Sequence, residues 1–468
     1  MIQVSQMSSI NRSQVSQAAA LLALITRLHF YIGLFVGPFI LAAALTGTAY
    51  VLTPQLEDWL YKDQLTTTAT GPAHSLAEQI EVAQAAMAGQ GKLFAVRPAP
   101  DAHATTRVMF SEPGLGESES RAIFVDPITL AVKGDLVVYG TSGVLPLRSK
   151  IDYMHRHLLL GDVGRNYSEL AASWLWIAAL GGFALWLTGG NKNRSEVAKR
   201  NGYLRHRRLH GLTGLWIGLG LLFFSATGLT WSKWAGDRID TLRSEFGWVT
   251  PSVSLQLGSA GAMPMGEHAD HQMQAAAPMV SLADPAMFDT ILKVARDGGI
   301  DAAKIEIRPP KAADKAWMVR EVDRSWPTQV DTIAIDGSKL AITSRADFAT
   351  FSLLPKLIRW GIDAHMGILF GLPNQLLLAA FGLALAVMVV LGYRMWWRRR
   401  PQAGATAQTL THAWQRLNSG WRTAIIVIAT GLGWCLPVMG VSLLAFLIVD
   451  VMRWRMTASR VQAEGDMA

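Results

Sequence analysis

The stretch that decides the fold is RLHFYIGLFVGPFILAAALTGTAYV, residues Arg27 to Val51. It returns as RLHGLTGLWIGLGLLFFSATGLTWS, residues Arg208 to Ser232, with His29 and His210 at the same place in the two copies. Each copy is an apolar run long enough to cross a bilayer as a helix. The sequence therefore predicts a membrane protein that is built from two related halves.

The repeat extends beyond these two runs. The spacing from His155 to Gly161 returns between His365 and Gly371. Each half consists of a span, a stretch of one helix and several strands, a short amphipathic segment and a second span. Two such units packed on each other predict a bundle with a pseudo-twofold axis, near which equivalent histidines meet.

The predicted fold class is an integral membrane α-helical bundle with four core spans in two pseudo-symmetric repeats, a C-terminal apolar segment and two α+β domains. Pro437 breaks the C-terminal segment, which fits either one tilted span or a short hairpin. In chain order we expect a tail (1–26), a span (27–52), an α+β domain (53–150), an interfacial helix (151–168), a span (169–188), a basic loop (189–207), a span (208–232), an α+β domain (233–355) with a flexible insert (256–280), an interfacial helix (356–373), a span (374–393), a linker (394–420) and the C-terminal segment (421–452).

Local signals predict the elements of the two α+β domains. Ser75 and Glu78 form a capping box that predicts a helix to about Ala88, and a second helix is expected near 284–297. Short apolar and β-branched runs predict strands at 93–98, 105–111, 121–126, 131–139, 303–309, 316–322, 330–336 and 339–344.

Charge patterning predicts the orientation. The loop 189–207 and the run Arg398–Arg400 are short and strongly basic, which predicts that they face the cytoplasm. The N-terminus is then cytoplasmic, and both α+β domains lie in the periplasm of a bacterial inner membrane. These clusters, and not nucleic-acid binding, explain the formal net charge of +8. The single cysteine, Cys435, excludes an internal disulfide and a cysteine-ligated iron–sulfur cluster.

His29 and His210 are the first candidate metal ligands, because two neutral imidazoles from opposed helices make a six-coordinate haem iron site. A flat macrocycle between helices needs surface without side chains, and glycines stand one and two turns beyond each histidine: Gly33, Gly37, Gly214 and Gly218. The alternative is an ordinary glycine-mediated helix contact. Arg27 and Arg208 precede the histidines and fit either haem propionates or membrane anchors. His206 is a second choice of ligand.

His155 and His365 are the second matched pair and predict a second haem near the outer face, with His157 as a second choice. The alternative is a pair of exposed histidines on interfacial helices. Trp174, Trp176 and Trp216 lie between the two predicted haems or simply pack the spans. The insert around Met263–Met273 carries methionines and histidines that suit copper, or is a flexible loop.

Other motifs bear on the electron donor and the substrate. The sequence has no G-x-G-x-x-G after a strand and no P-loop, so the donor is expected to be another protein or a membrane quinol. Cations in the α+β domains are available for an anionic ligand, or are ordinary solvated charges: Arg97, Lys133, Arg148, Lys150, Lys304, Arg308, Lys311 and Lys356.

The R-x-H-x-x-x-G spans, the HRHLLLG segment and the V-D-P and I-D-G turns resemble the PepSY-associated transmembrane family over about residues 20–400. The resemblance implies two PepSY-like periplasmic domains and haem ligation by His29, His210, His155 and His365. It also implies kinship with the inner-membrane ferric-siderophore reductases of that family.

The resulting hypothesis is a reductase with two haem b groups that passes electrons from a quinol or a cytoplasmic donor to a ferric siderophore. Two alternatives stay open: an electron-relay subunit for another envelope oxidoreductase, and a non-enzymatic PepSY module that binds a peptidase.

Overall fold

The computed structural model describes residues 2–188, 202–258, 284–398 and 409–465. The chain divides into two compact units. The span unit comprises Met1–Thr48, Met154–Ile239 and Ala379–Ala468, and the sheet unit comprises Ala49–Tyr153 and Asp240–Leu378. The Met/His insert 263–273 and most of the basic loop 189–207 lie outside the described residues.

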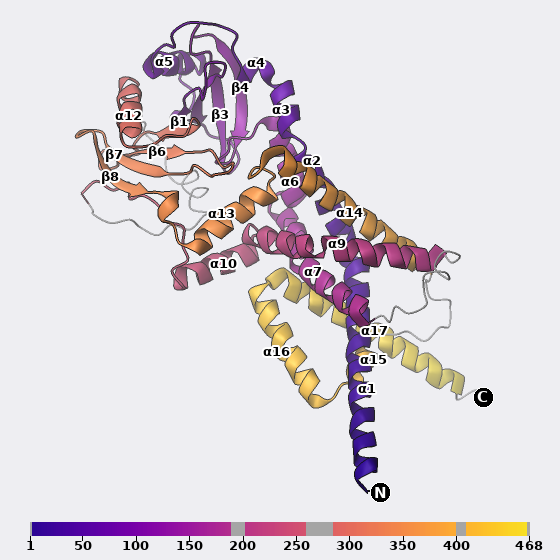
Figure 1. The fold of residues 1–468 in the computed structure, drawn as a ribbon. Helices are drawn as coiled ribbons and strands as arrows, with labels where there is room; N and C mark the ends of the chain where they lie inside the picture. Colours follow the sequence, from indigo (N-terminus) through magenta and orange to yellow (C-terminus); the bar gives the residue numbers. More distant parts are fainter. Residues whose placement is uncertain (1, 189–201, 259–283, 399–408, 466–468) are drawn as a thin grey trace. The chain divides into compact units, whose positions relative to one another are not determined.

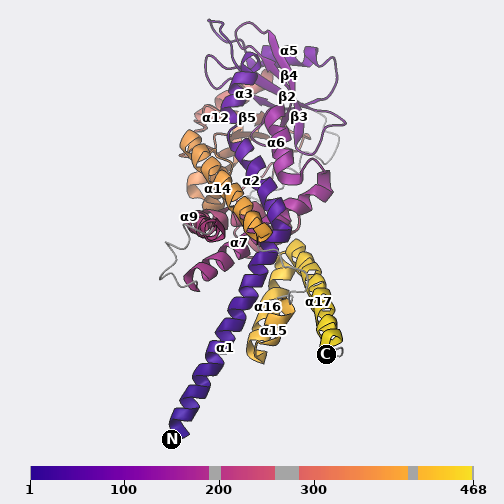
Figure 2. The ribbon, with the colours of Figure 1, turned by 90° about the vertical axis from the view of Figure 1, so that its right-hand side faces the viewer.

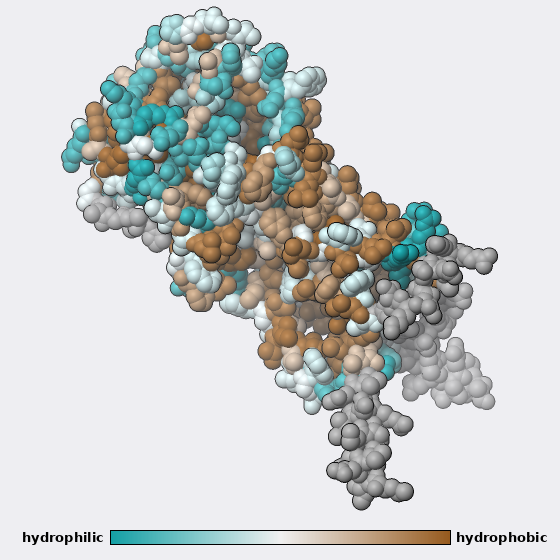
Figure 3. Space-filling view, in the orientation of Figure 1, coloured by the Kyte–Doolittle hydropathy of each residue, from teal (hydrophilic) through white to brown (hydrophobic). Residues whose placement is uncertain are grey.

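Five helices in the described part of the chain are long and apolar enough to cross a membrane. Their outer surfaces carry large apolar side chains, as on α9, where Trp216 and Leu219 are 83% and 82% exposed. Figure 3 shows this apolar surface over the spans and more polar side chains over the sheet unit. The five stretches are Gln17–Val51 (α1 Ile2–Tyr31, η1 Ile32–Val36, α2 Gly37–Val51), α7 Gly161–Thr188, α9 Gly202–Thr230, α14 Gly371–Arg398, and Pro437–Met456 within α17 Pro437–Gly465.

The helices begin earlier than the apolar runs suggest. We expected an interfacial helix over 151–168 and a span over 169–188, but α7 is continuous from Gly161. A Cβ at Gly164 would collide with the backbone carbonyl of His157. Gly164 is therefore a point of close packing, and the polar first turns of α7 carry no hydropathy signal of a helix.

The C-terminal segment forms two helices that meet at a sharp turn and diverge from it (Figure 2). α16 (Ser419–Cys435) and α17 meet at Leu436, and α15 (Leu410–Gln415) precedes them. Gly433 and Gly440 are in close contact across the turn, where a side chain on either one would be crowded. Of these two helices, α17 alone reaches the length of a span.

Both halves of the sheet unit have the predicted four strands, and they join into one antiparallel sheet with the order β4-β3-β2-β1-β5-β6-β7-β8. The seam between the halves is the pairing of Val96 with Ile307. The strands are β1 Lys92–Arg97, β2 Thr106–Ser111, β3 Glu119–Val125, β4 Val132–Tyr139, β5 Ile305–Arg308, β6 Trp317–Glu321, β7 Thr332–Asp336 and β8 Ala341–Ala346.

Two helices cover one face of this sheet, α5 (Leu76–Ala86) and α12 (Ala286–Asp297). Their apolar sides and the inward residues of both halves form one continuous core. The capping box of Ser75 and Glu78 is present as predicted. Asp289 of α12 also accepts hydrogen bonds from the first backbone N–H groups of α5, which fastens the two halves together.

Further helices flank the sheet and the spans. They are α3 Pro54–Leu60, α4 Lys62–Leu65, α6 Pro146–His157, α10 Trp234–Glu245, a 3-10 turn Phe348–Thr350 and α13 Leu353–His365. α6 and α13 overlap the segments 151–168 and 356–373, over which two interfacial helices were predicted. Asp126 and Asp336 hold equivalent turns, because each carboxylate accepts from the backbone N–H groups two and three residues on. This shared turn geometry supports the repeat.

A paired-histidine candidate cofactor site

His29 of α1 and His210 of α9 lie beside each other in the span unit. Their ring centroids are 6.3 Å apart and the ring planes are nearly perpendicular, at 86°. Each histidine is near the start of an apolar stretch, where a polar side chain without a task is costly. The helical repeat thus brings the two matched histidines together in space.

Each ring is oriented by a backbone carbonyl of a neighbouring span. The Nδ1 atom of His29 is 3.1 Å from the Ala178 carbonyl oxygen of α7, and that of His210 is 2.9 Å from the Met388 carbonyl oxygen of α14. A carbonyl oxygen only accepts, so each Nδ1 carries the proton and donates. The Nε2 atom of each neutral ring then keeps its lone pair, which is the arrangement that metal-binding histidines use.

The centroid distance of the two rings is close to the distance expected for two imidazoles that bind one metal ion. A metal–imidazole bond is about 2.0 Å and the ring nitrogen is about 1.2 Å from the ring centroid, so two opposed imidazoles have centroids about 6.4 Å apart. The observed 6.3 Å agrees with this value. Two imidazoles are too few for a bare zinc ion, which takes four ligands, whereas a porphyrin brings four nitrogens of its own.

Glycines close to the two histidine rings leave space for the imidazoles, and some of these glycines were not predicted. A side chain at Gly182 would come within 3.2 Å of His29, and Gly181 and Gly392 face His29 and His210 at 3.7 and 3.8 Å. The adjacent glycines Gly181 and Gly182 in the second span are the sequence pattern that could have indicated this contact. Of the four predicted glycines, Gly33 and Gly218 border open space, while Gly37 packs on Tyr393 and Gly214 on Met388.

A π-helical turn, Ile32–Val36, begins three residues after His29. Its wide turn is closed by a bond from the Gly37 N–H to the Ile32 carbonyl. Tyr393 of α14 donates a 2.7 Å hydrogen bond to the Leu34 carbonyl in this turn. Such turns often accompany functional sites, since they shift the register of the residues around them.

His155 lies in a second polar niche of the span unit. Its Nδ1 is 3.1 Å from the Thr46 hydroxyl, and the Ala43 carbonyl also hydrogen-bonds the ring. A side chain at Gly47 would come within 3.0 Å of the ring. Burial lowers the pKa of His155 to about 4, so the ring is neutral at pH 7. Thr46 and Gly47 therefore hold this histidine in place directly.

The remaining candidates are placed as follows. His365 ends α13 in the sheet unit and is half-buried. His157 and His206 are also half-buried. Arg27 is half-buried within electrostatic reach of Asp450, and Arg208 is exposed, so the two arginines do not share one environment. Among the tryptophans, Trp174 is buried and donates to the Ser442 hydroxyl at 2.8 Å, which is a packing role.

A family model described as the PepSY-associated TM region matches residues 26–399. The chain belongs to the PepSY-associated TM family. The matched range of this PepSY-associated protein includes all four candidate histidines, and α15, α16 and α17 follow it. No curated protein matches the chain. The ligand roles of His29, His210, His155 and His365 stay predictions.

Proposed function

We propose that this PepSY-associated protein is a haem-containing reductase of the bacterial inner membrane that reduces ferric siderophores in the periplasm. The observation that carries the proposal is the His29–His210 pair, with centroids 6.3 Å apart and both Nδ1 atoms held by carbonyls of other spans. The positive-inside pattern supports the orientation, with the N-terminus in the cytoplasm and the sheet unit outside.

The residues present fit a haem b. When bound, the group would supply one-electron transfer. His29 and His210 would hold the iron, and the carbonyls of Ala178 and Met388 would fix the ring tautomers. A side chain at Gly33 or Gly218 would meet no atom within 4 Å. The prediction of a second haem at His155 and His365 belongs to the same proposal.

Iron chemistry favours reduction as the means of release. Siderophores bind iron through hard oxygen donors, which hold Fe³⁺ far more tightly than Fe²⁺. An electron delivered at the periplasmic side therefore loosens the chelate without moving it across the membrane. The electron donor in this proposal is a membrane quinol or a cytoplasmic protein.

A haem assay on the purified protein tests the cofactor. We expect haem b in the pyridine haemochrome spectrum, and we expect His210→Ala to remove one haem while the spectrum of the other remains. His206→Ala, one helical turn earlier on α9, is the matched control and should keep both haems. Protein that is purified without a Soret band would contradict the proposal and favour the peptidase-binding module.

A reoxidation assay tests the substrate. Dithionite-reduced protein should be reoxidised by a ferric siderophore, with Fe²⁺ trapped by a chelating dye. If the reduced haem keeps its electrons in the presence of several ferric chelates, and a partner oxidoreductase alone reoxidises it, the electron-relay function replaces the reductase.

A further inference from the structure

Arg148, in the first turn of α6, is a buried arginine whose acidic neighbour pairs with it only weakly. The side chain keeps 10% of its surface exposed, and Oε2 of Glu57 lies 3.7 Å from its Nη1, which is too long for a hydrogen bond. Glu57 uses its other oxygen to accept the Leu145 backbone N–H at 3.0 Å. The carboxylate therefore holds the chain just before α6 and leaves much of the guanidinium group unsatisfied.

The unsatisfied donors of Arg148 are two neighbouring nitrogens. Both Nε and Nη2 are buried, and neither has a hydrogen-bond partner in the part of the chain that the structure describes. Tyr50 fixes the orientation of the group, because its ring centroid lies 4.6 Å from the guanidinium carbon and its hydroxyl interacts with the same group. Buried N–H groups in native proteins are normally paired, so this fork is a place where a ligand would bind.

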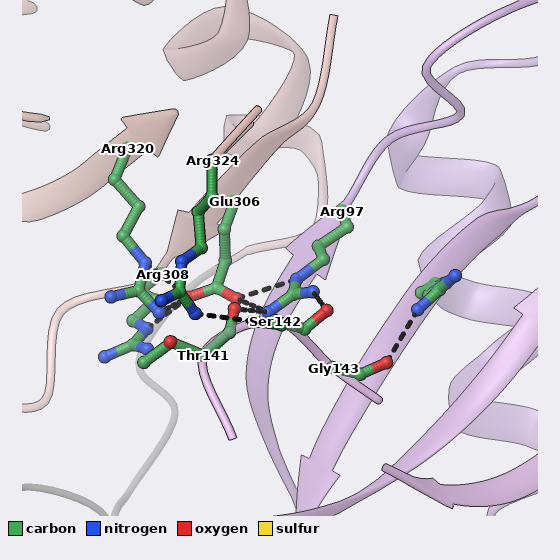
Figure 4. A network of polar contacts seen from close by, with 9 residues as sticks. Arg97, Thr141, Ser142, Gly143, Glu306, Arg308, Arg320 and Arg324 are labelled. Carbon is green, nitrogen blue, oxygen red and sulfur yellow. Dashed lines mark hydrogen bonds and ion pairs between the residues drawn. The ribbon is translucent and has the colours of Figure 1, made fainter. Parts of the chain in front are cut away.

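Arg97 of the same unit shows the contrast. Figure 4 shows its guanidinium group turned toward Glu306 and toward the loop that follows β4. Its Nε donates to the buried Glu306 at 2.8 Å. Its Nη1 and Nη2 donate to the carbonyls of Ser142 and Thr141, at 3.0 and 2.7 Å. All three nitrogens of Arg97 thus have an acceptor within the protein, whereas two of the three nitrogens of Arg148 have none among the described residues.

Arg148 and His155 lie on one face of α6. Seven residues, or about two helical turns, separate them. The first span has the matching order, since Thr46 contacts His155 and Tyr50, one turn later, contacts Arg148. α2 and α6 are each one continuous helix, so this order is a property of the helices themselves. In the predicted orientation, Arg148 is therefore the more periplasmic of the two residues.

We propose that the Nε–Nη2 fork of Arg148 binds a propionate group of the second haem, which His155 is predicted to ligate. An arginine fork binds a carboxylate through two parallel hydrogen bonds. The propionates are the charged edge of the macrocycle, and a charged edge is least costly toward the aqueous side of a membrane. The inference rests on the proposed function and deepens it, because Arg27 and Arg208 stand beside the other pair of histidines.

Haemin and haemin dimethyl ester test the contact, because the ester has the same iron and ring but no carboxylate. Full-length protein that is produced without haem is titrated with each compound in detergent, and the Soret band reports binding. His155→Ala identifies the second site by its loss. At this site Arg148→Gln should weaken haemin binding about tenfold, which equals about 1.4 kcal/mol, and should leave binding of the ester unchanged.

Lys150→Gln is the matched control. Lys150 is exposed and lies two residues after Arg148 in α6, so its loss removes the same charge from the same helix. Its affinity for haemin should equal that of the wild type. Arg148→Lys keeps a charge beside Glu57 but has no fork, and the ratio of its affinities for haemin and the ester should fall below that of the wild type. This variant decides the question if Arg148→Gln does not fold.

Two results would overturn the inference while the proposed function survives. One is equal affinity of the wild type and Arg148→Gln for haemin. The other is an equal loss for haemin and its ester, which is the result of a purely structural role. A wild type that binds no haemin overturns the inference and the proposed function together. If haemin binding ignores Arg148 while gallium(III) citrate binds in a manner that depends on it, the carboxylate belongs to a soluble ligand and the propionate assignment is wrong.

Discussion

Tyr31 of the first span donates a 2.6 Å hydrogen bond to Asp450 of α17. Asp450 is fully buried and also accepts from the backbone N–H groups of Leu410 and Thr411 at 2.8 and 2.7 Å. A single carboxylate therefore caps α15 and fastens the C-terminal helices to the span that carries His29. Asp450 and α15 lie beyond the range matched by the family model, whereas Tyr31 lies within it.

Loss of the Asp450 carboxylate should destabilise the span unit. Asp450→Ala leaves four donors without their acceptor, because the Thr411 hydroxyl also donates to this carboxylate. We expect a loss of about 2–4 kcal/mol in the free energy of unfolding. Tyr31→Phe removes one donor and should cost about 1 kcal/mol. Thermal unfolding in detergent measures both. Equal midpoints for Asp450→Ala and the wild type would show that the hydrogen bonds of Asp450 contribute nothing to stability.

The contact between Gly47 and His155 predicts unequal effects for two equivalent glycines. A methyl group at Gly47 would be 3.0 Å from the imidazole, whereas one at Gly228 makes an ordinary 3.5 Å contact with Ala172. Alanine also stabilises a helix by about 1 kcal/mol relative to glycine. We expect Gly228→Ala to raise the unfolding temperature slightly and Gly47→Ala to lower it. Two equal shifts would contradict the tight seat around His155.

Burial of His155 predicts a pH dependence of stability in the haem-free protein. Its pKa is about 4 in the folded protein against 6.5 in the unfolded chain, mainly because burial penalises the charged ring. The unfolded chain therefore binds the proton first as the pH falls. The free energy of unfolding should decline from about pH 6.5 to about pH 4, by at most about 3 kcal/mol from this group. His155→Gln should show a smaller decline over this window, and an unchanged slope would contradict the assignment.

Glu306 should matter more than other paired carboxylates of the sheet. Burial acts to raise the pKa of Glu306, but the guanidinium groups of Arg320, Arg308 and Arg97 outweigh it and hold the pKa well below its usual range. Glu306→Gln leaves buried positive charge without its partner, and we expect a loss of about 3–5 kcal/mol. Glu112→Gln, at the partly exposed pair with Arg121, should cost at most about 1 kcal/mol. Hydrogen exchange measured on peptides of β1 and β5 should accelerate in the first variant alone.

The sequence predicted what depends on local periodicity. The apolar runs, the eight strands and the capping box at Ser75 were all evident, because each is written within a few neighbouring residues. The matched positions of His29 and His210 followed from the repeat.

Such local patterns could not predict contacts between residues that are far apart in the sequence. The carbonyls of Ala178 and Met388 orient the histidines, and a backbone carbonyl has no signature in the side-chain sequence. The pairing of β1 with β5 joins segments far apart in the chain. Arg97 and Arg308 were candidates for an anionic chelate, but their convergence on Glu306 depends on that pairing.

The joined sheet also constrains how this protein is made. β1 ends at Arg97, and the strand that covers its edge, β5, begins only at Ile305, so synthesis exposes an unpaired edge until most of the chain has emerged. Exposed edges invite pairing with other strands. A gene fragment that encodes the first half alone would therefore yield a sheet with an unpaired edge at β1. We expect the truncated product to self-associate through that edge.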